Sequence, residues 1–340
     1  MTTQNPVVAV VGPTGSGKSA FATELASRLG GEIICMDSTT VYRGFTIGSA
    51  KPLPEDRARV PHHLVDILDP DAPFSAYLFV EWASRALSDV HSRGKIPILV
   101  GGTYFYLRAL QNGMAKEGWI PTETLETLEL EFSEDDEIHT GRMHDELSKR
   151  DPAAAAKIHK NDKYRLLRAL AIARTGVLKP SQLVVTTPLE SQSRLWIKYS
   201  MLVSRHHLTQ VITRRTETML AAGLVQETKN LLEKWPTAKA LASIGYQECC
   251  RHLRREITEK QLRNEIIEKT RQLAKRQVTW IRSDPEIRFV DSRDIERAQA
   301  EIGNLLTALA SGKDVKGPVL TVPNPFNQKT HDSEAAACAP

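Results

Sequence analysis

Apolar runs alternate with helix-like segments along the first third of the chain. Residues 7–11 are five consecutive small apolar residues, a pattern typical of a strand buried on both faces. Residues 19–29 have helical spacing, and residues 32–36 resemble a second strand. A helical pattern over 76–91 precedes a third predicted strand at 96–100. Strands that alternate with helices predict an α/β fold with a mostly parallel sheet flanked by helices, in which ligands collect at the carboxyl ends of the strands.

The pattern changes after residue 112. Strand signals vanish over 113–194, where charged and alanine-rich segments predict a helical insertion. Residues 195–203 return the chain to the sheet, and the remainder to about 310 is predicted to be mainly helical, interrupted at Gly223 and Gly245. The resulting division is a core formed by 1–112 and 195–312, an α-helical insertion domain at 113–194, and a disordered tail at 313–340.

Composition places the chain among ordinary globular proteins. It has 340 residues, of which 41% are hydrophobic and 25% charged, so it has enough length for one large or two medium domains. The cysteines Cys35, Cys249, Cys250 and Cys338 lack the spacing of a zinc site or a disulfide framework, which favours a reducing compartment. No apolar run approaches the ~18 to 20 residues of a membrane span, and the polar N-terminus leads directly into the first strand. We expect a cytoplasmic protein that does not bind a membrane.

Charge is segregated along the chain although the net charge is only +4. Residues 121–148 hold ten acidic residues against one arginine, whereas residues 251–290 hold eleven basic residues against six acidic ones. The basic strip is a candidate surface for a polyanion, and a solvated helix face is the alternative. The acidic run at 123–137 is expected to face solvent, because carboxylates repel phosphates.

A phosphate-binding pattern directly follows the first strand. All eight positions of G-x-x-x-x-G-K-[ST] are satisfied by Gly12, Pro13, Thr14, Gly15, Ser16, Gly17, Lys18 and Ser19. The glycines let the backbone N–H groups turn inward, Lys18 supplies a positive charge, and the Ser19 hydroxyl can bind a metal ion. The sequence therefore predicts a P-loop NTPase-like fold that binds an oligophosphate, with Mg²⁺ as cofactor and Ser19 as its ligand.

Two further candidates follow the next predicted strands. Asp37 comes directly after the second strand, where it can accept a proton from a nucleophile, or alternatively cap a turn. The third strand ends in Gly101, Gly102 and Thr103 instead of a magnesium-binding acid, which disfavours a motor or switch ATPase. Thr103 can form a hydrogen bond at the same edge. The rings of Tyr104, Phe105, Tyr106 and Trp280 are predicted to pack in the core, with stacking on a base as the alternative.

Eight separated blocks of sequence resemble the bacterial tRNA dimethylallyltransferases over residues 7–290. The blocks are 12–19 (GPTGSGKS), 37–38 with 41–44 (DS and VYRG), 47–52 (IGSAKP), 61–66 (PHHLVD), 101–103 (GGT), 158–162 (IHKND), 244–246 (IGY) and 271–277 (RQLAKRQ). The chain departs from the family pattern at Thr39, Thr40 and Val211, and near Leu125.

The resemblance implies transfer of a dimethylallyl group from dimethylallyl diphosphate to N6 of adenosine 37 in the anticodon stem-loop of tRNA. In that reaction Asp37, Thr103 and Lys18 are the implied catalytic residues, and the P-loop together with Arg215 binds the diphosphate. The implied tRNA contacts are Asp37, Ser38, Thr39, Thr40, Thr103, Tyr164, Arg165, Leu166, Leu167, Arg168, Ala242, Ser243, Ile244, Gly245, Tyr246, Gln247, Lys275, Arg276, Gln277, Val278, Thr279, Trp280, Ile281 and Arg282. A monomer is expected.

Two alternative functions remain open at this point. An adenylate isopentenyltransferase carries out the same chemistry on free AMP or ADP, but it does not need a large insertion or the basic strip at 275–282. A P-loop kinase, or a nucleotide-dependent RNA-binding module, is the second alternative, since some kinases organise magnesium through a hydroxyl and water.

Overall fold

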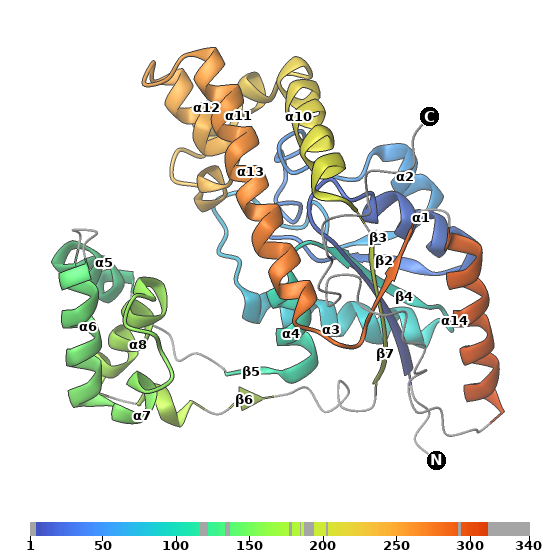
Figure 1. The fold of residues 1–340 in the computed structure, drawn as a ribbon, viewed down its shortest axis with the longest axis horizontal. Coiled ribbons are helices and arrows are strands. Elements are labelled where there is room, and N and C mark those ends of the chain that lie inside the picture. The colour runs from blue at the N-terminus through green and yellow to red at the C-terminus, as the bar shows by residue number, and fades with distance from the viewer. Residues whose placement is uncertain are drawn as a thin grey trace, which may run out of the picture. The chain divides into compact units, whose positions relative to one another are not determined.

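The computed structural model describes residues 5–115, 122–132, 137–176, 179–183, 185–186, 194–201, 203–291 and 294–311. The chain divides into two compact units, and Figure 1 shows the elements of each. Unit 1 is Met1–Asn112 with Pro188–Pro340, and unit 2 is Gly113–Thr187. The insertion thus begins where the sequence predicted but ends before residue 194, because Arg194 pairs with Asn5 in the sheet of unit 1. The tail predicted at 313–340 lies outside the described residues.

A parallel sheet forms the centre of unit 1. In the part of the chain that the structure describes, its strands are β1 (Asn5–Val11), β2 (Glu32–Cys35), β3 (His62–His63), β4 (Pro97–Gly101), β7 (Arg194–Met201) and β8 (Ile287–Val290), in the order β3-β2-β4-β1-β7-β8. The apolar run of β1 is buried from Val7 to Val11, as its composition predicts for a central strand covered on both faces.

Helices cover both faces of this sheet. Val8 and Val10 share a core cluster with α1 (Lys18–Leu29) and α14 (Ile295–Ala310), which contact each other on that face. Because successive strand residues point to opposite faces, Val7, Ala9 and Val11 face the other side, where α3 (Ala76–Ser92) packs on β2 and β4. The remaining elements around the sheet are α2 (Pro54–Arg59) and α4 (Tyr104–Asn112).

The four predicted strands are confirmed as β1, β2, β4 and β7, with ends shifted by a residue or two. The stretch up to residue 310 is mainly helical as predicted, but it also contains β8, which was not predicted and which pairs Lys198 with Ile287 at the edge of the sheet. Four residues alone do not distinguish a strand from a helix. The equally short β2 was marked by the Gly30–Gly31 helix stop before it, whereas β8 is a strand through its pairing with β7. The same reason explains why the two-residue β3 had no signal.

A helical layer completes unit 1. It consists of α10 (Arg205–Ala221), α11 (Leu224–Lys234), η2 (Lys239–Ala242), α12 (Tyr246–Leu253) and α13 (Glu259–Arg282). Its core also takes in Val41, Tyr42 and Phe45 from the segment that follows β2. Gly223 and Gly245 precede α11 and α12 with φ of 100° and 97°, a left-handed conformation that glycine adopts without strain, so both predicted interruptions are confirmed.

Unit 2 is a helical body with its own core. Its elements are α5 (Thr122–Glu131), α6 (Glu137–Arg150), α7 (Pro152–Ala155), α8 (Lys163–Thr175), η1 (Pro180–Gln182), and the short strands β5 (Met114–Ala115) and β6 (Val185–Thr186). Leu128, Phe132, Met143 and Leu147 pack against the inner face of α8. The sequence prediction of helices here is confirmed, but β5 and β6 form an antiparallel pair where no strand was expected.

Candidate functional site

The predicted site residues gather at the carboxyl ends of three neighbouring strands. Asp37 follows β2, Thr103 follows β4, and the P-loop at 12–17 follows β1, while the sheet order places β4 between the other two. Val11 pairs with Gly101, so the P-loop and the Gly-Gly-Thr turn leave the sheet at the same level. The tertiary structure therefore brings together the three segments that the sequence placed at strand ends.

The P-loop has the backbone conformation of an anion site. Gly15 and Gly17 have φ of 80° and 82°, and the Ser16 N–H donates to the Pro13 carbonyl at 3.2 Å. A Cβ at Gly12 would lie 2.6 Å from Ser16 Oγ, so a larger residue there would force the Ser16 hydroxyl to move. The N-terminus of α1 receives no side-chain cap, which leaves its N–H groups directed at an incoming anion.

The Ser16 hydroxyl is buried and has no hydrogen-bond partner among the described residues. A buried polar atom without a partner costs free energy, so an oxygen-rich ligand in the loop would satisfy it. Ser19 lies in the first turn of α1 and is exposed. Both hydroxyls have the chemistry that an oligophosphate and its magnesium ion require.

Two cations and one carboxylate meet beside the P-loop. Burial and, to a smaller extent, the positive charge of Arg215 lower the pKa of the Lys18 ammonium to about 8, although the negative charge of Asp37 opposes the change. Burial likewise lowers the pKa of Arg215, again opposed by Asp37. Arg215 comes from α10, nearly two hundred residues after Lys18 in the chain. Concentrated positive charge that is partly removed from water favours binding of a polyanion.

Asp37 caps the turn that follows β2, which is one of the two roles that the sequence left open. Its Oδ1 accepts the backbone N–H groups of Thr39 and Thr40 at 2.8 Å and 3.1 Å, and the Thr39 hydroxyl at 2.6 Å. These bonds cap the turn and fix the direction of the carboxylate. Within the described part of the chain, all three end on Oδ1, which leaves Oδ2 to act toward a ligand.

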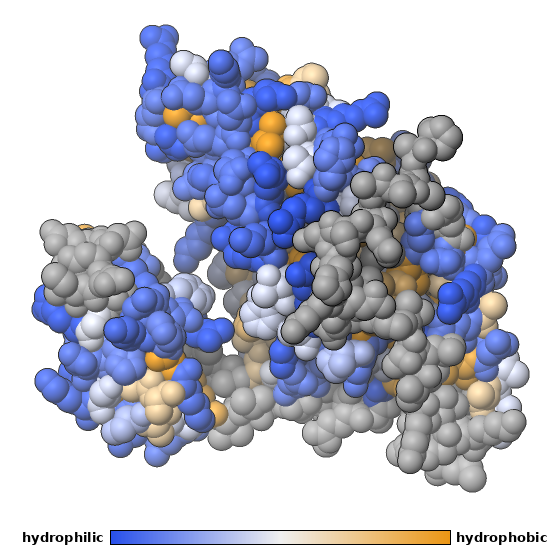
Figure 2. Space-filling model, in the orientation of Figure 1, coloured by the Kyte–Doolittle hydropathy of each residue, from blue (hydrophilic) through white to orange (hydrophobic). Residues whose placement is uncertain are grey.

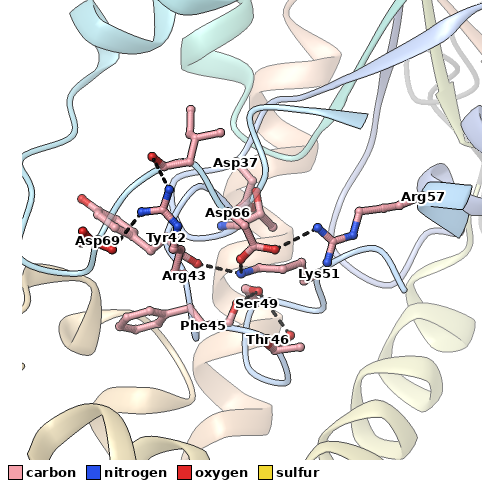
Figure 3. Close-up of polar contacts among 12 residues, drawn as sticks. Asp37, Tyr42, Arg43, Phe45, Thr46, Ser49, Lys51, Arg57, Asp66 and Asp69 are labelled. Carbon is pink, nitrogen blue, oxygen red and sulfur yellow. Dashed lines mark hydrogen bonds and ion pairs between the residues drawn. The ribbon is translucent and has the colours of Figure 1, made fainter. Parts of the chain in front are cut away.

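Figure 3 shows the polar contacts of the segment that follows this turn. The Asp66 N–H donates to the Thr40 carbonyl at 3.2 Å, directly after the Asp37 turn. The Asp66 carboxylate receives the buried Lys51 ammonium at 2.5 Å and Arg57 at 2.9 Å, and Lys51 also donates to the Tyr42 carbonyl at 2.7 Å. Sequence reasoning used Lys51 and Asp66 only as parts of matching blocks and assigned them no role.

Gln277 has a different place from the one expected. It was grouped with the tRNA contacts, but its side chain reaches Thr14 in the P-loop and Gly102 after β4. No periodicity of α13 distinguishes Gln277 from its polar neighbours. The feature of the sequence that relates to these contacts is the glycine at position 102, because a Cβ there would lie 2.3 Å from the Gln277 amide nitrogen.

The basic face predicted on α13 is exposed. Lys275, Arg276 and Arg282 lie at the surface, and the surface over α10 to α13 is largely hydrophilic (Figure 2). Ile281 is buried and supports the helix from the inside. The prediction that Trp280 packs in the core was wrong: the side chain is 39% exposed, with its ring 6.4 Å from that of Tyr104.

The aromatic residues after Thr103 behave differently from one another. Tyr104 and Tyr106 are buried, which confirms the prediction of core packing for these two rings. Phe105 is 49% exposed, so the same prediction was wrong for it. Because α4 packs only one side against the protein, the residue between two buried tyrosines points outward.

The stretch from Ala242 to Gln247 is only partly accessible. Ala242 and Gln247 are exposed, whereas Tyr246 is fully enclosed and donates its hydroxyl to Glu227 at 2.6 Å. The side chain of Tyr246 therefore holds the segment in place and cannot reach a macromolecular ligand. Glu227 was not singled out from the sequence.

In unit 2 the predicted contacts are split between the surface and the core. Tyr164 and Arg165 are exposed, and the Arg168 guanidinium lies 5.8 Å from the Tyr164 ring centroid. Leu166 and Leu167 are buried in the core of unit 2, so their side chains support α8 and do not face a ligand. Their apolar character at this helical spacing indicated that outcome.

The acidic run is not simply a solvated face. Glu131 is exposed, as expected, but it also forms an ion pair with Arg174 at 2.6 Å, and Arg174 pairs with Glu146 at the same distance. These pairs join α5, α6 and α8. Residues 133–136 of the run lie outside the described residues.

Two kinds of feature are absent from the part of the chain that the structure describes. No described helix is both long and apolar enough to cross a membrane. No cluster of three or more His, Cys, Asp or Glu side chains that could hold a metal ion occurs there. Cys35, Cys249 and Cys250 are buried free thiols, and Cys338 lies outside the described residues.

Comparisons with known proteins agree with this geometry. The family described as IPP transferase matches residues 40–284, and the one described as isopentenyl transferase matches residues 5–61. The tRNA dimethylallyltransferase of Geobacter metallireducens is 43% identical, over 84% of this chain and 92% of the relative, and that of Syntrophobacter fumaroxidans is 40% identical, over 87% and 86%.

Solved structures show the same similarity. The crystal structure of a tRNA isopentenylpyrophosphate transferase from Bacillus halodurans has a TM-score of 0.66 and 32% identity, covering 91% of this chain and 99% of the relative. A eukaryotic dimethylallyltransferase acting on tRNA has a TM-score of 0.69 and 27% identity, covering 92% of this chain and 81% of the relative. The alternatives of a free-nucleotide acceptor and a kinase are not favoured by these relatives.

Proposed function

Because the chain belongs to the IPP transferase family and is a tRNA-modifying prenyl transferase, we propose that it moves the dimethylallyl group of dimethylallyl diphosphate to N6 of adenosine 37 in tRNA. The products are N6-dimethylallyladenosine and diphosphate. The observation that carries the proposal is the meeting of Asp37, Lys18 and Arg215 beside the P-loop. This charge cluster supports a role for Asp37 as proton acceptor and for Lys18 and Arg215 as cations that bind the diphosphate.

The chemistry divides between these side chains. The N6 lone pair is conjugated with the purine, so the amine is a poor nucleophile and needs both alignment and a good leaving group. As the new bond from N6 to the allylic carbon forms, the bond from that carbon to oxygen breaks and its electron pair leaves with the diphosphate. Asp37 accepts the N6 proton through Oδ2, while Lys18 and Arg215 stabilise the charge that develops on the diphosphate.

Magnesium fits the donors at the P-loop. The described residues provide no cluster of carboxylates for a protein-only magnesium site, but Mg²⁺ is commonly held by one or two protein oxygens together with substrate phosphates. Ser19, with its exposed hydroxyl in the first turn of α1, would supply the protein oxygen. When bound, the ion would neutralise part of the charge on the leaving diphosphate.

A macromolecular acceptor is supported by exposed basic side chains in both units. Lys275 and Arg276 lie at the surface of α13 in unit 1, and Arg165 lies beside the exposed Tyr164 on α8 in unit 2. Such side chains bind phosphates and stack on unpaired bases. Adenosine 37 must leave its stack for its amine to approach Asp37. We expect the enzyme to work as a monomer in the cytoplasm, where tRNA is modified.

The proposal is tested by offering the purified chain dimethylallyl diphosphate with Mg²⁺ and one of three acceptors. These are unmodified tRNA, the same tRNA with guanosine at position 37, and AMP. Nucleoside mass spectrometry should detect N6-dimethylallyladenosine only with the first. Turnover of AMP alone would overturn the proposal in favour of a free-nucleotide acceptor, and tighter binding of ATP than of dimethylallyl diphosphate would favour a kinase.

A further inference from the structure

Gln277 joins two loops of the candidate site from the C-terminal part of α13. Its Oε1 accepts the Thr14 N–H at 2.9 Å, and its Nε2 donates to the Gly102 carbonyl at 3.0 Å. Thr14 belongs to the P-loop after β1, and Gly102 belongs to the turn after the adjacent strand β4. One side chain therefore sets the spacing between two loops that come from neighbouring strands.

The geometry requires an amide at this position. The Thr14 partner is a donor and the Gly102 partner is an acceptor, so the side chain must accept at one end and donate at the other. Asparagine is one methylene shorter, and glutamate cannot donate when ionised. Both contacts join groups that are partly buried, where an unpaired N–H or C=O is costly.

Gly102 provides the space that this amide occupies. A Cβ at residue 102 would lie 2.3 Å from Gln277 Nε2 and 3.4 Å from the Gly12 carbonyl oxygen. The backbone of Gly102 is not in the left-handed region, so alanine there would be opposed by the amide, which would have to move, and not by its own φ. The Gly-Gly-Thr block thus has a physical partner on α13.

The neighbours of Gln277 on α13 point elsewhere. Lys275 and Arg276 are exposed and form no ion pair within the described residues, whereas Gln277 is half-buried. Residues one and two positions apart on a helix lie on different faces. The same turn of α13 therefore presents cations to solvent and an amide to the P-loop.

We propose that Gln277 is a positioning residue of the diphosphate site, and not a tRNA contact. The Gln277 side chain holds the P-loop and the turn after β4 at the separation that the diphosphate needs. It also accepts the hydrogen bond of the Thr14 N–H, so that the later N–H groups of the loop are the ones that bind the ligand. This inference rests on the proposed function for the identity of the ligand, but the contacts themselves do not depend on the acceptor.

The test compares variants at the inner and outer faces of the same helical turn. We expect Gln277→Ala to weaken binding of inorganic pyrophosphate by about tenfold in calorimetry without tRNA, the loss corresponding to one or two hydrogen bonds. The same variant should leave the affinity for tRNA unchanged. The matched control is the pair Lys275→Gln and Arg276→Gln, which should weaken tRNA binding and leave pyrophosphate binding unchanged.

A second pair of variants guards against a simple loss of folding. Gly102→Ala should displace the amide and mimic Gln277→Ala, whereas Gly102→Ala in the Gln277→Ala background should add little, because the amide that it would strike is gone. Full additivity of the two changes would overturn the proposal. Weaker tRNA binding with unchanged pyrophosphate binding in Gln277→Ala would also overturn it. Pyrophosphate binding is measured without any acceptor, so failure of the proposed tRNA reaction would be seen separately.

Discussion

Glu227 accepts the backbone N–H of Ile47 with both carboxylate oxygens, at 3.0 Å and 2.9 Å. The same carboxylate receives the Thr46 N–H at 3.2 Å and the Tyr246 hydroxyl at 2.6 Å. A Cβ at Gly48 would lie 2.4 Å from the Tyr246 ring, so the segment after Asp37 is packed directly on α11 and α12. The Glu227 carboxylate thus adds these polar contacts to the apolar packing that anchors the segment after Asp37 to the helical layer.

Replacing Glu227 by glutamine should destabilise the protein. The amide keeps one acceptor but turns an NH₂ group toward backbone donors, so we expect the free energy of unfolding to fall by about 2 to 4 kcal/mol. Chemical denaturation measures this change. Glu233→Gln is the matched control, since Glu233 is exposed on the same helix and lies 3.9 Å from Lys229, and it should have almost no effect. Equal effects of the two variants would contradict the anchoring role.

Two ion pairs in Figure 3 allow a comparison of buried and exposed charges. Lys51→Met removes an ammonium that is almost fully buried between Asp66 and the Tyr42 carbonyl, and it should lower the free energy of unfolding by about 2 to 4 kcal/mol. Arg43→Met removes the Arg43–Asp69 pair, in which both side chains are more than half exposed, and should cost at most about 1 kcal/mol. Urea titrations of both variants test the difference.

The Lys51 pair also predicts a response to acid. Burial acts to raise the pKa of Asp66, but the hydrogen bonds and charges of Lys51 and Arg57 outweigh burial and hold that pKa below its ordinary value. A carboxylate with a lowered folded-state pKa stabilises the protein above its unfolded-state pKa, and this stability is lost as pH falls through the folded-state pKa. Lys51→Met should therefore show a shallower loss of stability in acid than the wild type. Parallel curves would refute the assignment.

Lys18 predicts a response at alkaline pH. With a pKa of about 8 in the free protein, Lys18 loses its proton as pH rises above that value, so affinity for dimethylallyl diphosphate should fall there. Binding of the diphosphate favours the charged form of Lys18, so Lys18 takes up a proton when the ligand binds above its pKa. Calorimetry in buffers of different ionisation enthalpy should detect this proton uptake near pH 8.5, about half a unit above the Lys18 pKa. Lys18→Met should bind weakly and without this uptake. Arg215→Gln should move the midpoint upward, because the Arg215 charge lowers the Lys18 pKa.

The dependence of protein stability on pH is a second test of the lowered Lys18 pKa. Between the folded-state pKa of about 8 and the ordinary lysine value, the unfolded state binds more protons than the folded state. Stability should consequently rise with pH across this interval, in proportion to the difference in bound protons. In Lys18→Met that part of the rise should be missing. A profile identical to wild type would contradict the lowered pKa.

Two substitutions separate the roles of Asp37. Asp37→Asn retains an oxygen that can accept the Thr39 and Thr40 N–H groups but cannot take a proton, so kcat should fall by about 10² to 10⁴ with little change in stability. Asp37→Ala should lose the same activity and in addition about 1 kcal/mol of stability through the lost turn contacts. Single-turnover kinetics and thermal unfolding measure the two effects. An active Asn variant would show that Asp37 is only a turn cap.

Salt dependence tests the outer face of α13. Replacing Lys275 and Arg276 together by glutamine should weaken tRNA binding and flatten the dependence of affinity on salt, because fewer counterions are released. Lys229→Gln, on the exposed side of α11, is a control for loss of general positive charge. An unchanged slope and affinity in the double variant would exclude this face as a phosphate contact.

Local patterns sufficed for the parts of the site that lie next to each other in the chain. The P-loop from Gly12 to Ser19 was recognisable because a strand, a turn and a helix start are consecutive there. Asp37 was recognisable because the carboxyl ends of parallel strands share one edge of the sheet. Trp280 was misjudged because helical spacing describes a face, while burial depends on what packs against that face.

The amino-acid sequence by itself determined the parallel α/β core, the anion-binding turn and the helical character of the insertion, since these follow from the period of apolar residues and from the conformations that glycine permits. Only the tertiary structure decided which partners Gln277, Glu227 and Lys51 have. Gln277 and Thr14 are 263 residues apart in the chain. A polar side chain of given type can hydrogen-bond to any suitable group that folding brings within about 3 Å, so its partner is a property of the assembled chain.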